Sequence, residues 1–406
     1  YSKYTVDYPY PVAISVHSNR IGMEYPMICF NGGRPAKDGT YSERTKYGMW
    51  GVIIHEVGHN FFPMIINSDE RQWTWMDEGL NTFVQYLTEQ EWERDYPSRR
   101  GPARHIVNYM KGDKSNISPI MTNSESLFQF GNNAYGKPAT ALNILRETIM
   151  GRDLFDFAFK TYCERWKFKH PTPADFFRTM EEASAVDLDW FWRGWFFTTD
   201  HVDISLDEVK YYQLNTNDPV VEKAFKAQEK NKEAPYIETE RNKKDIKSTV
   251  NEWDSNIDDF YAKRDIYKVD ALDKADYEKF KKKLSAEEKA LLDKNQYFYE
   301  LQFSNVGGLV SPIIIEANFK NAPKELIYIP AEIWRKHEDK VSKVLIFDHE
   351  VSSFQLDPFL ETADTEVDNN SWPVKLEPTR YQLFHQKRSR ENPMQRQKKV
   401  DKLNEK

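Results

Sequence analysis

Residues 49–90 read MWGVIIHEVGHNFFPMIINSDERQWTWMDEGLNTFVQYLTEQ, and this stretch decides the fold expected around it. It contains His55 and His59, four positions apart, and Glu78, which follows His59 after eighteen intervening residues. Residues four apart on a helix share one face, so the two imidazoles can bind a single metal ion. A third ligand from a second helix would complete the set, and Glu78 has the side chain for that role.

The apolar pattern predicts both helices. Pro63 predicts the end of the first helix or a kink in it, because proline removes a backbone donor and clashes with the preceding turn. The second helix is expected over about residues 75–94, with Glu78 near its start. Both expectations rest on apolar residues at core spacing, namely Trp50, Val52, Ile53, Ile54, Val57, Phe61, Phe62 and Ile65 in the first helix and Leu80, Phe83, Val84 and Leu87 in the second.

Two neutral imidazoles and one carboxylate form a ligand set typical of catalytic zinc, since they leave a fourth position open for water. A structural zinc site would be closed, usually by cysteine thiolates. Glu56 stands beside the first ligand, where it can take a proton from that water and deliver it to a leaving amine. The plain alternative is a chance HExxH match, and Glu78 at a suitable spacing is the observation against it.

Length, net charge, hydropathy and cysteine number limit the classes of protein to which this chain can belong. The chain has 406 residues, enough for two or three domains, and its net charge of -7 gives no reason to expect a nucleic-acid partner. No apolar run approaches the ~20 residues that span a bilayer. Cys29 and Cys163 leave room for at most one bridge and do not fit the metal spacing. The chain begins with Tyr1 and has no charged-then-apolar leader, so a removed signal peptide or upstream region is expected.

A short segment before the first predicted helix reads as a sheet edge. Gly22, Met23 and Glu24 lie between predicted strands at residues 12–16 and 27–30, and a proline follows at position 26. Proline is tolerated at an edge because it has no ladder bond to lose there, and an exposed edge can pair with an extended peptide. The plain alternative is that Glu24 is a solvated surface carboxylate.

Taken in order, the Gly-Met-Glu segment, HExxH, Glu78, and Tyr135 followed two residues later by Lys137 resemble the gluzincin aminopeptidases, the family of aminopeptidase N and leukotriene hydrolase. The resemblance implies one Zn²⁺ ion bound by His55, His59 and Glu78. It implies that Glu56 is the general base and that Tyr135 donates a hydrogen bond to the tetrahedral oxyanion. It also implies that Glu24, with Gly22 and Met23 beside it, binds the free α-ammonium group of a peptide substrate.

The sequence departs from the usual family pattern near these positions. Tyr25 stands where the family more often has asparagine, and Gly136 and Pro138 alter the surroundings of the catalytic tyrosine. Asp77 stands where asparagine commonly precedes the ligand glutamate. Its carboxylate could accept a hydrogen bond behind a metal ligand, or it could be solvated or cap a helix. None of these departures removes a ligand or the base.

We predict an α+β fold with three parts. Residues 1–200 would form a thermolysin-like, mostly helical zinc peptidase domain, in which residues 138–150 are expected to form a helix. Residues 201–375 would form a small antiparallel β-sandwich with a charged helical insertion at about 215–295. Within the insertion, residues 274–294 read as one exposed amphipathic helix with Phe280, Leu284 and Leu291 facing inward. Residues 376–406 read as a basic, disordered tail. Trp190, Trp192 and Trp195 could line a pocket, with core packing as the other reading.

The function expected from the resemblance is zinc-dependent hydrolysis of the N-terminal peptide bond of peptides with a free N-terminus. An endopeptidase or dual-function hydrolase, and a weakly active zinc-bearing peptide-binding scaffold, stay open as alternatives. Family members carry a large β-domain ahead of the Gly-Met-Glu segment, which here would be missing and is expected to complete the substrate pocket. The resemblance also implies a periplasmic or secreted location. No membrane-spanning segment is expected.

Overall fold

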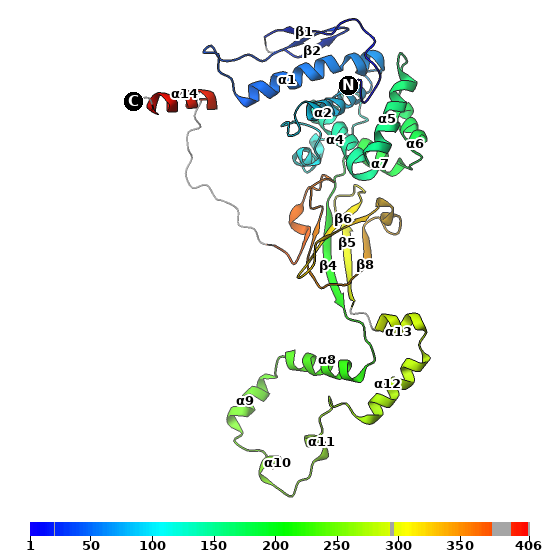
Figure 1. Cartoon of the computed structure of the whole chain (residues 1–406), viewed down its shortest axis with the longest axis vertical. Coiled ribbons are helices and arrows are strands. Elements are labelled where there is room, and N and C mark those ends of the chain that lie inside the picture. Colours follow the sequence, from blue (N-terminus) through cyan, green and yellow to red (C-terminus); the bar gives the residue numbers. More distant parts are fainter. Residues whose placement is uncertain (20, 293–295, 376–390, 405–406) are drawn as a thin grey trace. The chain divides into compact units, whose positions relative to one another are not determined.

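The computed structural model describes residues 1–19, 21–292, 296–375 and 391–404 (Figure 1). Its contacts divide the chain into two compact units. The first unit contains Tyr1–Val209, Leu301–Lys343 and Ser352–Lys406, and the second contains Lys210–Glu300 and Val344–Val351.

A three-stranded sheet precedes the first helix, with the strand order β1-β3-β2. Strand β1 (Ile14–His17) runs parallel to β3 (Ile28–Asn31), and β2 (Met23–Tyr25) runs antiparallel to it, with Glu24 opposite Cys29. Strand β2 therefore lies at the edge, as the sequence predicted. This sheet packs along helix α1 (Glu43–Gly58), which brings the edge strand close to the HExxH helix (Figure 1).

Helix α1 begins at a serine cap, because the Ser42 side chain accepts a hydrogen bond from the Thr45 amide. After Gly58 the chain enters a π-helical turn, η1 (Asn60–Ile65), in which Phe62 departs from helical geometry with φ −130° and ψ 112°. The residue before a proline is pushed out of the helical region by the proline ring, and here that ring belongs to Pro63. The predicted interruption at Pro63 is confirmed.

The second predicted helix is also present, as a π-helical turn η2 (Trp75–Gly79) continued by α2 (Leu80–Trp92). It ends slightly before position 94, since Glu93 is extended. Gly79 permits a close approach to the next helical segment: a Cβ there would lie 2.6 Å from Cγ of Pro138 and 2.9 Å from the Ala134 carbonyl oxygen. A side chain at position 79 would therefore push the segment that carries Tyr135 away from Glu78.

Further helical segments of the first unit follow this pair along the chain, up to Phe197. Trp192 and Trp195 are only 3% and 2% exposed and pack among phenylalanine rings, so they belong to the core and do not line a pocket. The predicted helix at 138–150 is present as two successive segments, α4 and η6. The segments are η3 (Ala103–His105), α3 (Val107–Met110), η4 (Lys114–Asn116), η5 (Gly131–Gly136), α4 (Lys137–Ile144), η6 (Leu145–Ile149), α5 (Arg152–Trp166), α6 (Pro173–Ser184) and α7 (Asp189–Phe197).

Two sheets follow the helical part, which confirms the predicted fold class. One has the strand order β4-β5-β8 and the other the order β10-β9-β6-β7, in which β6 pairs with β7 and β9 with β10 in antiparallel fashion. The strands are β4 (Ile204–Tyr212), β5 (Tyr297–Asn305), β6 (Ile313–Phe319), β7 (Glu325–Ile329), β8 (Lys340–Phe347), β9 (Val351–Leu356) and β10 (Ser371–Trp372), with the short turns η7 (Ala331–Arg335) and η8 (Val367–Asn369).

The charged insertion is helical, as expected, but its last part was predicted wrongly. One amphipathic helix was expected over residues 274–294, with Leu291 facing inward. The structure has two helices there, because the Ser285 and Glu288 side chains each accept from the other's backbone amide and so start a new helix. Leu291 is 50% exposed. The helices are α8 (Pro219–Lys232), α9 (Ile237–Asp245), α10 (Val250–Trp253), α11 (Phe260–Lys263), α12 (Ala271–Lys283) and α13 (Ala286–Leu292).

The segment predicted to be a disordered tail contains a helix, α14 (Pro393–Asn404). Residues 376–390 and 405–406 of that segment lie outside the described residues, as do residues 293–294 of the predicted insertion helix. The three-part division of the chain stays a prediction. Among the helices that the structure describes, none is both long and apolar enough to cross a membrane.

Candidate metal centre

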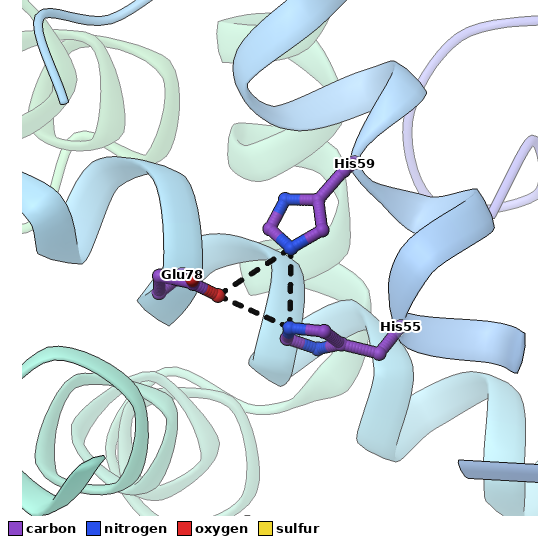
Figure 2. A group of neighbouring side chains, drawn as sticks. All are labelled: His55, His59 and Glu78. Atoms are coloured by element: carbon purple, nitrogen blue, oxygen red, sulfur yellow. Dashed lines mark hydrogen bonds and ion pairs between the residues drawn. The ribbon is translucent and has the colours of Figure 1, made fainter. Parts of the chain in front are cut away.

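Two imidazole nitrogens and one carboxylate oxygen converge on one point: His55 belongs to α1, His59 follows its last residue, and Glu78 belongs to η2 (Figure 2). Nε2 of His55 lies 3.1 Å from Nε2 of His59 and 3.1 Å from Oε2 of Glu78. Nε2 of His59 lies 3.4 Å from the same carboxylate oxygen. The sequence prediction that these three side chains meet is confirmed.

The spacing of these atoms fits a bound zinc ion. Ligands about 2.0 to 2.2 Å from a tetrahedral ion stand about 3.3 to 3.6 Å from one another, slightly more than the separations of 3.1 to 3.4 Å found here. The arrangement also directs two imidazole nitrogens and a carboxylate oxygen at one another, and a cation at their centre would satisfy all three. Both cysteines, Cys29 and Cys163, are free and buried and take no part in the cluster.

His59 is held from behind by two oxygen atoms. Its Nδ1 lies 2.9 Å from the Phe62 carbonyl oxygen and 2.9 Å from a carboxylate oxygen of Asp77. The interruption before Pro63 places that carbonyl, since Phe62 has left the helical conformation. The Nδ1 proton is thereby fixed and Nε2 is left to bind metal. Asp77 is only 4% exposed, so it lies behind a ligand and is not solvated.

The carboxylates around His59 also set its charge. Burial lowers the pKa of His59, but hydrogen bonds to Asp77 and Glu78 outweigh burial and raise that pKa well above its ordinary value. Burial likewise raises the pKa of Glu78, yet its contacts with His55 and His59 outweigh burial and hold the pKa at about 2. The site therefore favours positive charge at its centre, which a divalent cation would supply.

His55 is oriented by a chain of polar side chains that the sequence did not reveal. Its Nδ1 lies 2.9 Å from Oε1 of Gln85, and the Gln85 amide nitrogen donates to Glu89 at 2.8 Å and to the Gly51 carbonyl at 3.2 Å. Ser98 donates to the other oxygen of Glu89. Because the amide nitrogen has two acceptors, the Gln85 oxygen must face His55, and the Nδ1 proton of His55 is fixed.

Glu56 and the edge strand approach each other at the site. Glu56 is 6% exposed, and burial raises its pKa to about 7, although the charge of His59 opposes the shift. A Cβ at Gly22 would lie 2.6 Å from Oε1 of Glu56, so glycine is needed where the strand segment meets this carboxylate. Glu24 comes within 4.8 Å of both His59 and Asp77. Glu24 of strand β2 therefore lies near His59, and Gly22, just before the strand, lies against Glu56.

Tyr135 reaches the centre from η5. Its hydroxyl donates to Oε1 of Glu78, and its ring is stacked on that of His55 with 5.7 Å between centroids. Burial and the charge of Glu78 both raise the pKa of Tyr135, so the phenol keeps its proton. Above the ring lies the guanidinium of Arg100, with Cζ 4.4 Å from the ring centroid. The sequence did not single out Arg100.

A cavity of about 560 Å³ opens beside these groups. His55, Glu56 and Tyr135 line it, together with residues from α1, α2 and the segment that follows α2. Among the described residues its lining does not include Gly22, Met23 or Glu24. Gly22 nevertheless meets this lining, because a Cβ there would lie 2.6 Å from Oε1 of Glu56 and 3.4 Å from Cγ1 of Val52, whereas the Glu24 carboxylate lies near His59.

Comparison with known proteins agrees with this site. Residues 1–195 match the model of the peptidase family M1 domain. Glutamyl aminopeptidase of Bos taurus is 27% identical over 165 residues, which cover 39% of this chain and 17% of that protein. Probable aminopeptidase 1 of Sulfurisphaera tokodaii is 23% identical over 214 residues, covering 48% of this chain and 27% of that one. The chain thus spans less than a third of the length of these relatives.

Solved structures of similar proteins include aminopeptidase A of Legionella pneumophila in complex with aspartic acid, with a TM-score of 0.45 and 13% identity over 86% of this chain and 31% of that one. They also include the M1 zinc metallopeptidase of Deinococcus radiodurans, with a TM-score of 0.37 and 18% identity over 49% of this chain and 42% of that one. The family match confirms the resemblance to the gluzincin aminopeptidases. Residues 1–195 belong to peptidase family M1.

Proposed function

We propose that this chain is a zinc-dependent aminopeptidase that hydrolyses the N-terminal peptide bond of peptides. The observation that carries the proposal is the convergence of His55, His59 and Glu78 on one point beside a buried glutamate and a tyrosine phenol. The M1 match and the names of the relatives support the same activity.

Each side chain at the centre has a role that its position supports. A zinc ion held by the three ligands would polarise the scissile carbonyl and lower the pKa of a water molecule. Glu56 would accept a proton from the attacking water and pass it to the leaving amine, since its carboxylate is buried next to His55. Tyr135 would donate its phenol proton in a hydrogen bond to the oxyanion, a contact typically worth about 2.7 to 4 kcal/mol.

Glu24 supports an exopeptidase over an endopeptidase. It stands on an edge strand, where an extended peptide can pair, and its carboxylate lies close to the cluster. A carboxylate in this position would form an ion pair with a free α-ammonium group and would fix the first peptide bond at the zinc. Gly22 allows this strand to approach Glu56, and Met23 precedes the clamp residue on the strand.

The test is the Glu56→Gln variant. Glutamine keeps the volume of the side chain but cannot accept the proton, so the variant is expected to retain zinc and lose nearly all turnover of an aminoacyl-arylamide. Metal analysis and activity with and without a chelator measure both properties. Unchanged hydrolysis by the variant would remove Glu56 from the mechanism. Peptide binding without cleavage by the zinc-loaded wild-type chain would favour the scaffold alternative.

We also propose that the protein acts in the periplasm or outside the cell, as the family resemblance implies. Fractionation of the native host would test this location.

A further inference from the structure

Arg100 lines the cavity together with Arg44 and Arg99, and among the described residues it forms no ion pair with an acidic side chain. Its guanidinium lies over the Tyr135 ring and lines the same cavity as His55 and Glu56. Within the part of the chain that the structure describes, no ion pair or hydrogen bond involves its side chain. A half-buried guanidinium usually has a carboxylate or carbonyl partner, because taking it from water without one costs free energy.

The two carboxylates that act on the charge of Arg100, Glu78 and Glu89, already have other partners. Glu78 contacts His55, His59 and Tyr135, and Glu89 accepts hydrogen bonds from Gln85 and Ser98. Neither carboxylate pairs with Arg100, although both are near enough to influence its charge. The partner that Arg100 lacks would therefore come from a molecule that enters the cavity.

The proposed function tells which part of a substrate would enter. Glu24 would hold the α-ammonium group on the side of His59, outside the cavity lining. Tyr135 and the ligand cluster would hold the scissile carbonyl. The peptide beyond that carbonyl would then continue past His55 and Glu56, into the cavity that Arg100 also lines.

We propose that Arg100 binds a carboxylate on the leaving part of the substrate, either the C-terminal carboxylate of a short peptide or an acidic side chain. This inference rests on the proposed aminopeptidase function. A guanidinium presents parallel N–H donors that match a carboxylate in two hydrogen bonds, which makes arginine suited to this recognition. The enzyme would then prefer short peptides, or peptides with aspartate or glutamate after the first residue.

A purely structural role for Arg100 makes a different prediction. The guanidinium could act only by holding the Tyr135 ring through its stacking contact. Loss of Arg100 would then lower the binding affinity of all substrates to the same extent, whether or not they carry a carboxylate. The comparison of paired ligands that differ only in that charge separates the two roles.

The experiment measures binding in the zinc-loaded Glu56→Gln background, so that its outcome does not depend on turnover. Titration calorimetry would compare the dipeptide Leu-Ala with Leu-Ala amide for the terminal carboxylate. It would compare Leu-Asp amide with Leu-Asn amide for the side chain. The variants are Arg100→Gln and Arg100→Lys, and the matched control is Arg94→Gln, which removes the same charge from an exposed position outside the cavity lining.

We expect the acid of at least one pair to bind roughly 10- to 100-fold more tightly than its neutral partner, the range for a hydrogen bond to a charged group. Arg100→Gln should remove that ratio, Arg100→Lys should keep part of it, and Arg94→Gln should leave it unchanged. A higher affinity for Leu-Ala than for its amide would show that Arg100 binds the C-terminal carboxylate. A higher affinity for Leu-Asp amide than for Leu-Asn amide would show that it binds an acidic side chain. A ratio near one in both pairs, or one that survives Arg100→Gln, overturns the proposal. Hydrolysis of leucine arylamide by the wild-type chain, measured in parallel, tests the aminopeptidase function separately.

Discussion

Replacement of Gln85 by leucine should weaken zinc binding without touching a ligand. The Gln85 oxygen is the acceptor for the Nδ1 proton of His55, at 2.9 Å, and it fixes which ring nitrogen faces the metal. Leucine has nearly the same volume but offers no acceptor. The His55 ring could then turn, or its Nδ1 proton could be left without a partner in a half-buried site.

The size of the effect follows from the contacts that are lost. One neutral hydrogen bond is worth about 0.5 to 1.5 kcal/mol, and leaving a buried donor unpaired costs about 1 to 3 kcal/mol. Loss of such a supporting contact typically lowers metal affinity about 10- to 100-fold, equivalent to roughly 1.4 to 2.8 kcal/mol. The variant also removes the donor to Glu89 and to the Gly51 carbonyl, so the metal-free protein should lose stability as well.

Competition with a chromophoric chelator would measure the zinc dissociation constant of the wild type and of Gln85→Leu. Gln72→Leu is the matched control, because Gln72 is exposed and its side chain accepts a hydrogen bond from Asn123, outside the chain of Gln85, Glu89 and Ser98 that orients His55. Thermal unfolding of the metal-free proteins would separate folding stability from zinc affinity. An unchanged zinc affinity in Gln85→Leu would refute the assignment of Gln85 as the group that orients His55.

Two further predictions concern the substrate clamp and a buried cation. Glu24→Ala should lower kcat/KM about 10- to 100-fold on peptides with a free N-terminus, because it removes a charge-assisted contact, and should affect N-acetylated peptides less; equal losses on both would contradict the clamp. Lys137 is 1% exposed and donates only to the Thr198 carbonyl at 3.2 Å among the described residues, and burial lowers its pKa to about 7 from 10.5. Below about pH 7 Lys137 is protonated in the folded chain, which must then keep this positive charge buried. From there to about pH 10.5 the unfolded chain keeps its proton while the folded chain does not, so the wild type gains stability as the pH rises. Lys137→Met should therefore raise the melting temperature most at and below about pH 7, where burying the charge costs roughly 4 to 5 kcal/mol, and less towards pH 10. A pH-independent difference between the two proteins would contradict this reasoning.

The sequence predicted the parts of the site that local patterns encode. The spacing of His55 and His59 needs only a helix, and Pro63 marks its interruption by a steric rule that acts on the neighbouring residue. The edge position of β2 could be predicted for the same reason, from a short strand followed by proline. The role of Glu56 was argued from its place beside the first ligand as well as from the resemblance, whereas the roles of Tyr135 and Glu24 came from the resemblance. All three stay proposals here.

What the sequence did not predict depends on contacts between distant segments. Ser98 and Arg100 follow the end of α2, where no periodicity marks them, and they reach the site only because the chain folds back. Gln85 stands two helical turns after Glu78 on the same face, a spacing that could have suggested a supporting role. The split of the insertion helix at Ser285 was a missed local signal, since serine with glutamate three residues later is a capping box.

The most direct test of the metal centre is X-ray absorption at the zinc edge of the zinc-loaded chain, with Glu78→Gln as the comparison. Our account predicts one zinc ion per chain with nitrogen and oxygen neighbours at about 2.0 to 2.2 Å, two of them imidazole, and a loss of affinity in Glu78→Gln. Sulfur neighbours at about 2.3 Å, or a zinc environment unchanged by Glu78→Gln, would contradict it.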